Sequence, residues 1–331
     1  MGGIVCFNNE NYIGNNNISY KSNILLFIYM IIETKKKGNV TIFIVKKNSN
    51  FNINTKANTK ITRSLIPDII NYNADVYTDT GKLLLRFRKN VLNNTNIDDF
   101  YKNTIDFAKT PTNNRGSAIG SSKKNIKDNP KVQTNIIGYF DTFSPKQKFM
   151  LKNHPGILTV RETRFNNKFP NKFKNAYPLI KDIDELYSKI VPDKYKEQRK
   201  KANQTFFKIK DTSFSTVTLN VNFQTTVHTD KGDDPDGFGN LVVIEHGEYS
   251  GGETCFPEYG IGVDVRTGDI LFMDVHEPHG NLPIIKKTDE AQRLSIVCYL
   301  RLNIWKKTKG KTRKFMDNHL RKLNTLLDRK S

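Results

Sequence analysis

The residues best suited to bind a metal are a histidine and an aspartate two positions apart, with further histidines later in the chain. His228 and Asp230 end the run 214–230, in which apolar and polar residues alternate. Residues two apart in a β-strand share a face, so the alternation predicts that both side chains point the same way. His276 and His279 compete for the place of a third ligand. Two histidines and one carboxylate form the facial set of non-haem iron(II) enzymes, which leaves positions open for substrate and oxygen.

An Arg-x-Ser pair downstream is suited to a dicarboxylate co-substrate. Arg293 and Ser295 open the β-like run 293–302 and share a face if that run is a strand. The arginine fork can hold a carboxylate through two parallel hydrogen bonds, and the serine hydroxyl can add a third. The order His-x-Asp, His, Arg-x-Ser predicts a dioxygenase that uses iron(II), 2-oxoglutarate and O2. No catalytic residue beyond the metal ligands is predicted.

Other polar residues near these motifs are candidates to line a pocket. Asn222 belongs to the polar stripe that leads to His228, and Asp233 lies in the acidic turn after Asp230. Asn220 shares the stripe, and either asparagine could contact the co-substrate or satisfy buried backbone groups. Cys298 has the opposite strand parity to Arg293, which predicts a buried core thiol.

The elements that must position these residues are short β-rich runs. They cover 214–227, 239–246, 261–265, 270–275, 279–285 and 293–302, separated by Gly, Asp and Pro turns. This spacing predicts a closed or sandwiched sheet rather than alternating strands and helices. The predicted class is mainly β with α support (α+β), with a double-stranded β-helix (jelly-roll or cupin-like) core and a mixed N-terminal region.

Four segments are expected along the chain. The first, 1–60, is rich in Asn, Lys and Ile and is predicted to be a poorly ordered extension with one strand at 40–45. We also expect translation to start at Met30, because 1–29 has no periodic core. Strands around 79–81 and helices at 97–108, 145–152 and 177–203 characterise the support region. The predicted divisions are 1–60, the mixed α/β support region 61–212, the dioxygenase core 213–305 and a basic C-terminal tail or helix 306–331.

The charge balance predicts a polyanionic partner. Lys and Arg number 53 against 33 Asp and Glu, a formal charge of +20, and the segment 306–331 alone holds ten positive and two negative residues. Such a surplus favours nucleic acid as the partner. The longest apolar run, 24–32, is shorter than the roughly 20 residues of a membrane span, so we expect no membrane partner. Three widely spaced cysteines and no signal-peptide cleavage site predict an intracellular protein, nuclear or viral/cytoplasmic, that is not secreted.

The segment 214–302 resembles the core of the 2-oxoglutarate/iron(II) dioxygenases, and within them the TET/JBP group of nucleobase oxygenases, in its lower-eukaryote or viral branches. The resemblance rests on Asn222–Asp233, Tyr249–Glu253, Pro257–Asp264, His279–Ile284 and Arg293–Val297, with weaker similarity at 114–116 and 138–141. The group's pattern fits His279 better than His276.

The resemblance implies hydroxylation of the methyl group of a methylated base in DNA, 5-methylcytosine or thymine. It implies metal ligands His228, Asp230 and His279, and 2-oxoglutarate held by Arg293 and Ser295. The alternative is a protein (prolyl-type) hydroxylase of the same superfamily, which shares this skeleton. A barrel that only binds nucleic acid is a third interpretation, against which the complete set of motif residues argues.

Overall fold

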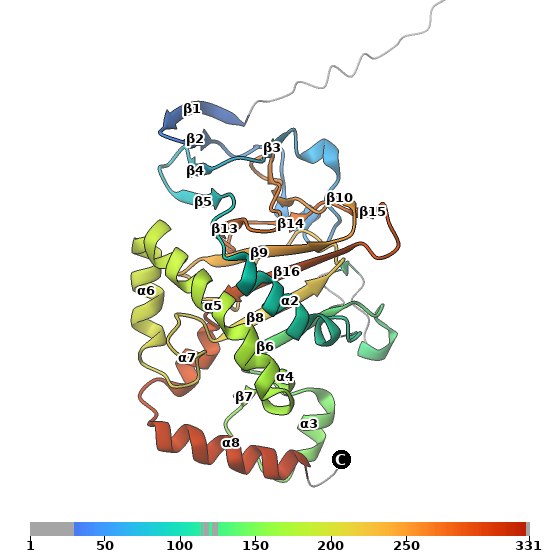
Figure 1. The fold of residues 1–331 in the computed structure, drawn as a ribbon, viewed down its shortest axis with the longest axis vertical. Coiled ribbons are helices and arrows are strands. Elements are labelled where there is room, and N and C mark those ends of the chain that lie inside the picture. The colour runs from blue at the N-terminus through green and yellow to red at the C-terminus, as the bar shows by residue number, and fades with distance from the viewer. Residues whose placement is uncertain (1–29, 114, 116–118, 121–124, 329–331) are drawn as a thin grey trace, which may run out of the picture.

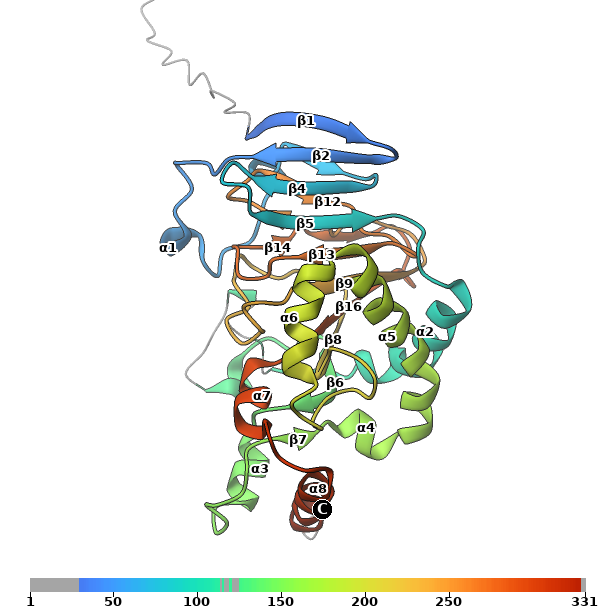
Figure 2. The same cartoon turned by 90° about the vertical axis from the view of Figure 1, so that its left-hand side faces the viewer.

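The largest element of the fold is a ten-stranded sheet (Figure 1, Figure 2). The computed structural model describes residues 30–113, 115, 119–120 and 125–328. Neighbouring strands of this sheet are antiparallel, except that β2 (Val40–Val45) and β4 (Ala74–Thr78) run parallel to each other. In spatial order the strands are β1 (Ile31–Lys37), β2 (Val40–Val45), β4 (Ala74–Thr78), β5 (Leu83–Arg88), β13 (Ile270–Met273), β9 (Gly239–His246), β16 (Gln292–Tyr299), β8 (Thr216–Val221), β6 (Thr134–Phe140) and β7 (Arg161–Glu162).

A smaller sheet faces the inner side of the large one. Buried side chains of both sheets, such as Leu241 and Met273 of the large one and Phe256 and Ile261 of the small one, pack into one cluster. Two facing sheets with a shared core confirm the predicted α+β class with a jelly-roll-like core, although helices are as extensive as strands. The four-stranded sheet has the order β14 (Gly280–Asn281), β11 (Thr254–Phe256), β12 (Ile261–Val263) and β3 (Asp68–Ile70), and β10 (Tyr249–Gly251) pairs with β15 (Ile284–Lys286).

Helices cover the outer side of the large sheet. Val217 and Leu219 of β8 pack against this helical layer, whereas Thr218 and Asn220, of the other parity, line a cavity between the sheets. The predicted division of this strand into an apolar and a polar face is therefore confirmed for 216–221. The helices are α1 (Ile53–Lys56), α2 (Asn94–Ala108), α3 (Pro145–Met150), α4 (Arg164–Lys168), α5 (Pro170–Ile190), α6 (Pro192–Ala202), α7 (Leu302–Thr308) and α8 (Arg313–Asp328), with 3-10 turns at Arg63–Leu65 and Ile126–Asp128.

The N-terminal expectation needs correction. Residues 1–29 lie outside the described residues, so the predicted start at Met30 stays a prediction. The strand predicted at 40–45 is confirmed as β2. The segment 31–37 is not part of a poorly ordered extension, because it forms β1 and extends the large sheet. Val45 is fully buried there, which its Asn- and Lys-rich surroundings did not suggest. The sheet also runs across the predicted division at residue 213, since β13 of the core pairs with β5.

Two sequence-based elements are shorter than predicted. The strand that should carry the metal residues ends at Val221, because Asn222 has a positive φ of 48° that breaks the extended backbone. The helix expected over 177–203 is two helices, because Pro192 lacks the N–H that would continue α5 and instead begins α6.

The basic tail forms helix α8, which docks on the protein. Met316 and Leu323 are buried against the region of β7 and α3, at the opposite end of the molecule from β1 (Figure 1). In the part of the chain that the structure describes, no helix is both long and apolar enough to cross a membrane.

Candidate metal and co-substrate site

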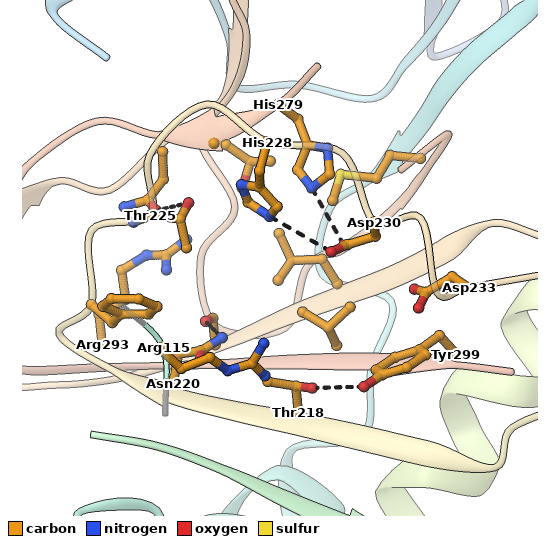
Figure 3. A pocket seen from close by; sticks show the side chains of 18 of the residues that line it. Arg115, Thr218, Asn220, Thr225, His228, Asp230, Asp233, His279, Arg293 and Tyr299 are labelled. Atoms are coloured by element: carbon orange, nitrogen blue, oxygen red, sulfur yellow. Dashed lines mark hydrogen bonds and ion pairs between the residues drawn. The ribbon is translucent and has the colours of Figure 1, made fainter. Parts of the chain in front are cut away.

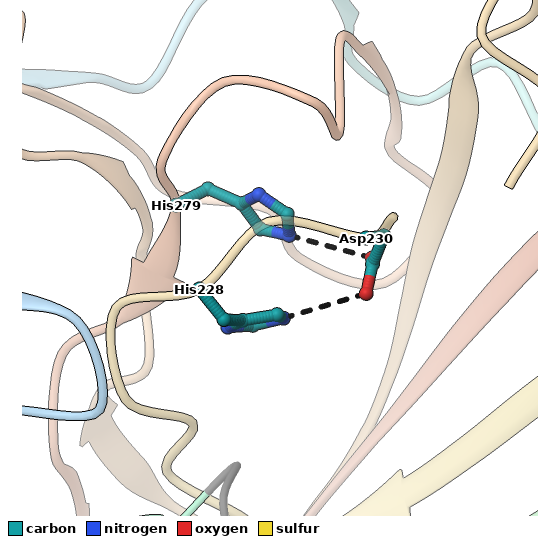
Figure 4. A group of neighbouring side chains, drawn as sticks. All are labelled: His228, Asp230 and His279. Atoms are coloured by element: carbon teal, nitrogen blue, oxygen red, sulfur yellow. Dashed lines mark ion pairs between the residues drawn. The ribbon is translucent and has the colours of Figure 1, made fainter. Parts of the chain in front are cut away.

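Two loops are joined by a short backbone bridge that places His228 beside His279. Each residue donates its N–H to the carbonyl of the other at 2.9 Å, an isolated antiparallel pair. Side chains of directly opposed residues in such a pair project to the same side. The imidazole rings are consequently 4.4 Å apart between centroids (Figure 4). Long-range pairing, and not a continuous strand, therefore unites the two histidines.

Asp230 completes the cluster. Its carboxylate oxygens lie 3.7 Å from His228 Nε2 and 3.6 Å from His279 Nε2. Its backbone N–H donates to Val275 O at 2.9 Å, which fixes the aspartate against the loop that leads to His279. The three donor atoms lie within 4.8 Å of one another, and within the described residues they form the one such cluster of His, Cys or carboxylate groups.

The tautomers of both histidines suit metal binding. His228 Nδ1 lies 2.7 Å from Thr226 O, and His279 Nδ1 lies 2.9 Å from Glu277 O. A carbonyl only accepts hydrogen bonds, so each Nδ1 carries the hydrogen in the neutral ring and each Nε2 offers its lone pair to the shared space. Two imidazole nitrogens and one carboxylate are a donor set that fits iron(II).

The electrostatics of the cluster show groups in close mutual contact. Burial and the neighbouring His279 lower the pKa of His228 to about 4, so the ring is neutral at physiological pH. Desolvation opposes ionisation of Asp230, but the hydrogen bond and the electrostatic interaction with His279, with a smaller contribution from His228, hold its pKa well below the ordinary value. Burial alone would lower the pKa of His279, and the contact with Asp230 raises it instead. The carboxylate therefore stays ionised and attracts any cation in this space.

His276, the competing ligand, lies outside the cluster. Its Nδ1 is 3.3 Å from Asp274 Oδ1, and its backbone N–H donates to the same carboxylate at 3.0 Å. The hydrogen bond with Asp274 raises the pKa of His276. His276 therefore stabilises its own loop through Asp274 and is not part of the triad.

A cavity of about 160 Å³ extends from the triad between the two sheets (Figure 3). Arg293 and Ser295 line it from β16, with Asn220 and Thr218 from the neighbouring β8. The predicted metal residues and the predicted co-substrate residues thus share one enclosed space. Other lining residues include Phe140, Thr225, Asp233, Asn281, Tyr299 and Arg301.

Arg293 is a buried cation at one end of this space. The side chain is only 4% exposed, and burial lowers the pKa of its guanidinium. Gly252 packs against it with a φ of +82°, and a Cβ there would lie 2.8 Å from Arg293 Cδ and Nε. A buried cation needs an anionic or hydrogen-bonding partner, which a carboxylate entering the cavity can supply.

The two predicted pocket residues have different places. Asp233 lines the cavity. Asn222 does not, because its side chain is hydrogen-bonded to backbone groups at the start of β16. Asn222 Oδ1 accepts from Arg293 N–H at 2.8 Å, and Nδ2 donates to Ala291 O at 2.9 Å. Asn222 therefore fixes the start of β16 and is not a lining residue, because its positive φ turns it away from the stripe.

The part of the chain that contains the triad is similar in sequence to a known protein family. Residues 148–302 match the family model Tet_JBP, described as the oxygenase domain of the 2OGFeDO superfamily. This segment is therefore similar to the oxygenase domain of TET/JBP proteins. This confirms the predicted superfamily and group.

The chain is also similar to thymine dioxygenases of Leishmania and Trypanosoma. The bifunctional helicase and thymine dioxygenase JBP2 of Leishmania braziliensis is 36% identical over 171 residues, 52% of this chain and 15% of the relative. Thymine dioxygenase JBP1 of Trypanosoma brucei brucei is 33% identical over 168 residues, 50% of this chain and 19% of the relative. The chain thus spans less than a fifth of the length of these relatives.

A solved structure shares the fold. NgTET1 in complex with 5mC DNA superposes with a TM-score of 0.51 at 14% identity, covering 83% of this chain and 89% of that one. Since it covers 83% of this chain, the likeness of fold extends beyond residues 148–302 and includes residues that precede 148.

Sequence reasoning missed cations that line the cavity. Arg301 lies just beyond β16; its Nε donates to Asp141 Oδ1 at 2.8 Å and its guanidinium stacks 4.8 Å from the Phe140 ring. No spacing rule pointed to it, since its place depends on the backbone pairing of Asp233 with Arg301. Arg115 reaches the cavity from a distant loop (Figure 3). The weaker resemblance at 114–116 was the one signal for that arginine.

Burial gives Asp233 a distinct chemical state. Burial, with the negative charge of Asp230, raises the pKa of Asp233 well above its ordinary value, and Arg301 offsets this only in part. A carboxyl that retains its proton can donate a hydrogen bond inside the cavity, beside the ionised Asp230.

Proposed function

We propose that this chain is an iron(II)- and 2-oxoglutarate-dependent dioxygenase that hydroxylates the methyl group of a methylated base in DNA, 5-methylcytosine or thymine. The observation that carries the proposal is a single cavity, within a TET/JBP-type oxygenase domain, lined by both the His-Asp-His cluster and a buried arginine.

The triad would hold the metal through His228 Nε2, His279 Nε2 and the Asp230 carboxylate. Iron(II) bound there would supply the oxygen-activating chemistry of the superfamily. The chain contributes the order of binding and the exclusion of water. His279 is 4% exposed and would hold the metal on the side that is closed to solvent. The Asp230 side chain is 38% exposed and would face the mouth of the cavity.

Arg293 and Ser295 would hold the far carboxylate of 2-oxoglutarate. The guanidinium fork offers two parallel donors, and the Ser295 hydroxyl lies on the same face of β16. Asn220 Nδ2 lies 3.4 Å from Ser295 Oγ and is itself fixed by Thr134 Oγ1, which donates to Asn220 Oδ1 at 2.6 Å. These contacts hold the hydroxyl ready to bind.

The methyl group of a base would enter from the mouth of the cavity. A base in a stacked duplex cannot reach a cavity between two sheets, so it must be flipped out. Asp233 and Arg301 would offer hydrogen bonds to its polar edge. The JBP1 and JBP2 relatives are thymine dioxygenases, and NgTET1 is seen with 5mC DNA, which supports a methylated base as the substrate.

Succinate release with three matched duplexes tests the proposal. One duplex contains cytosine and uracil and so carries no 5-methyl group. The second contains 5-methylcytosine and uracil, and the third cytosine and thymine. We expect one methylated duplex, or both, to stimulate succinate release, and nucleoside mass spectrometry to detect the hydroxylated base.

Two results would contradict the proposal. Equal succinate release with all three duplexes would exclude a methylated base as the substrate. Stimulation by a proline-containing peptide alone would support the protein hydroxylase instead. The Asp230→Ala variant is the background control and should release no succinate with any duplex.

A further inference from the structure

Helix α8 carries two stripes of opposite character on opposite faces. Met316, Leu320, Leu323 and Leu327 follow at helical spacing and pack against the protein. The face turned to solvent bears Lys314, Asn318, Arg321 and Thr325 at the same spacing, and all four are exposed. Lys322 adds a further exposed positive charge beside that stripe.

Among the described side chains of α8, the one acidic residue is Asp317, which is exposed at the edge of the solvent face. Arg313 Nε is 3.5 Å from its Oδ1 and offsets its charge. Arg321 donates from an Nη atom to Asn318 Oδ1 at 2.7 Å, so the amide orients the guanidinium along the helix surface. Lysine, arginine, amide and hydroxyl side chains are the residue types that contact DNA phosphates.

Backbone and side-chain contacts link this helix to the rim of the cavity. His319 Nε2 lies 2.7 Å from Val160 O, next to β7, whose Arg161 guanidinium is 5.8 Å from the centre of the Phe140 ring. Phe140 itself lines the cavity. Lys307 of α7 donates to Thr159 Oγ1 at 2.6 Å, and α7 begins directly after Arg301. These contacts attach the packed side of α8 to the segment that leads through β7 to Phe140 in the cavity lining.

A lipid surface fits this helix poorly. An amphipathic helix that binds a membrane inserts its apolar stripe between the headgroups. Here Met316 is 5% exposed and Leu323 1% exposed, because that stripe is already packed against the protein. Apart from Phe315 at its edge, the exposed face is polar and charged, and a partner would bind it mainly through charge and hydrogen bonds.

We infer that the solvent face of α8, formed by Lys314, Asn318, Arg321, Lys322 and Thr325, binds the phosphate backbone of duplex DNA beside the base that enters the cavity. The inference rests on the proposed function for the location of the base. It adds a separate phosphate-binding surface that holds the duplex while the base is turned out.

The test is a salt titration of duplex binding with two charge-matched variants in the full chain. The first variant is Lys314→Gln/Arg321→Gln/Lys322→Gln. The control is Lys36→Gln/Lys37→Gln/Lys46→Gln, which removes three exposed charges near β1, at the other end of the molecule (Figure 1). A duplex without 5-methyl groups is the probe, so that binding is measured independently of turnover.

We expect only the α8 variant to weaken binding, by about tenfold or more near 0.1 M salt. The slope of log affinity against log salt should fall by about 0.9 for each phosphate that the variant no longer neutralises. The charge-retaining Lys314→Arg/Lys322→Arg variant should keep the affinity of the unmodified chain. Circular dichroism checks that α8 stays folded in each variant.

Three outcomes would overturn the inference. Equal reductions in affinity in both variants would show a diffuse charge effect, and unchanged binding in the α8 variant would exclude the surface. Weaker binding to vesicles containing phosphatidylserine, with DNA binding intact, would identify a lipid partner. If the α8 variant no longer binds DNA while no duplex is ever oxidised, the proposed function fails and the DNA surface stands.

Discussion

The two ends of the cavity are built in different ways. Arg293 and Ser295 belong to β16, which pairs along its length with β8 and β9. The triad belongs to loops, where His228 and His279 are held by one isolated bridge. Regular pairing fixes side chains through strand parity, whereas a loop site depends on each contact that holds it. Substitutions at the triad end should therefore act on metal binding, and those at the arginine end on co-substrate binding.

Asp230→Ala should have the largest effect. Removal of the ionised ligand leaves two histidines, and we expect metal affinity to fall by more than about 100-fold, since even the outer partners of metal ligands are worth about 10–100-fold. Iron content and succinate release measure it, with the exposed Asp289→Ala as control. Full turnover in Asp230→Ala would remove the triad from the mechanism.

Arg293→Lys should act on the other end alone. An ammonium cannot reproduce the two parallel hydrogen bonds, and hydrogen bonds to charged groups are worth about 1.5–3 kcal/mol, so we expect the KM for 2-oxoglutarate to rise about 10- to 100-fold. Iron content should not change. Arg164→Lys, at an exposed position, is the matched control. An unchanged KM would assign the co-substrate to another group.

Gly252→Ala tests the arginine end of the cavity by displacing Arg293 without changing any charge. The φ of +82° disfavours alanine by about 1–2 kcal/mol, and its Cβ would press on the Arg293 stem. Gly81→Ala is a matched control, with a φ of +81° and nothing within 4 Å. Both variants should unfold at lower denaturant concentration, but only Gly252→Ala should raise the KM for 2-oxoglutarate. Equal KM values would show that Arg293 tolerates displacement.

Lys82→Met should give the smallest effect, at the triad end. Lys82 Nζ lies 2.6 Å from Asp274 Oδ2 and 2.8 Å from Glu277 Oε1, and the Glu277 carbonyl oxygen accepts from His279 Nδ1. Because Lys82 is 47% exposed, solvent weakens these pairs, and we expect metal affinity to fall by no more than about fivefold. Lys35→Met, which breaks the exposed pair with Glu33, should leave the affinity unchanged.

The sequence singled out residues that the structure brings together around one cavity, and it indicated the two faces of the regular strands. The alternation in 216–221 separated Val217 and Leu219 from Thr218 and Asn220, and the parity of β16 correctly predicted Cys298 as a buried core thiol. Period-two patterns are local, so a strand reports its two faces without knowledge of its neighbours. The order of the motifs can also be read directly along the chain, and it carried the resemblance to the oxygenase group.

Only the tertiary structure decided how the triad is assembled and what else surrounds it. The strand ends at Val221, so strand parity does not place His228 and Asp230. A backbone bridge joins His228 to His279, and the Asp230 N–H donates to Val275 O. Arg115 and Arg301 meet Asp233 through loops distant in sequence. β2 is the strand predicted at 40–45, but β1 gains order from pairing with it in the large sheet, which the composition of β1 does not predict. Such contacts join segments far apart in the chain, and no local pattern records which distant backbone groups will pair.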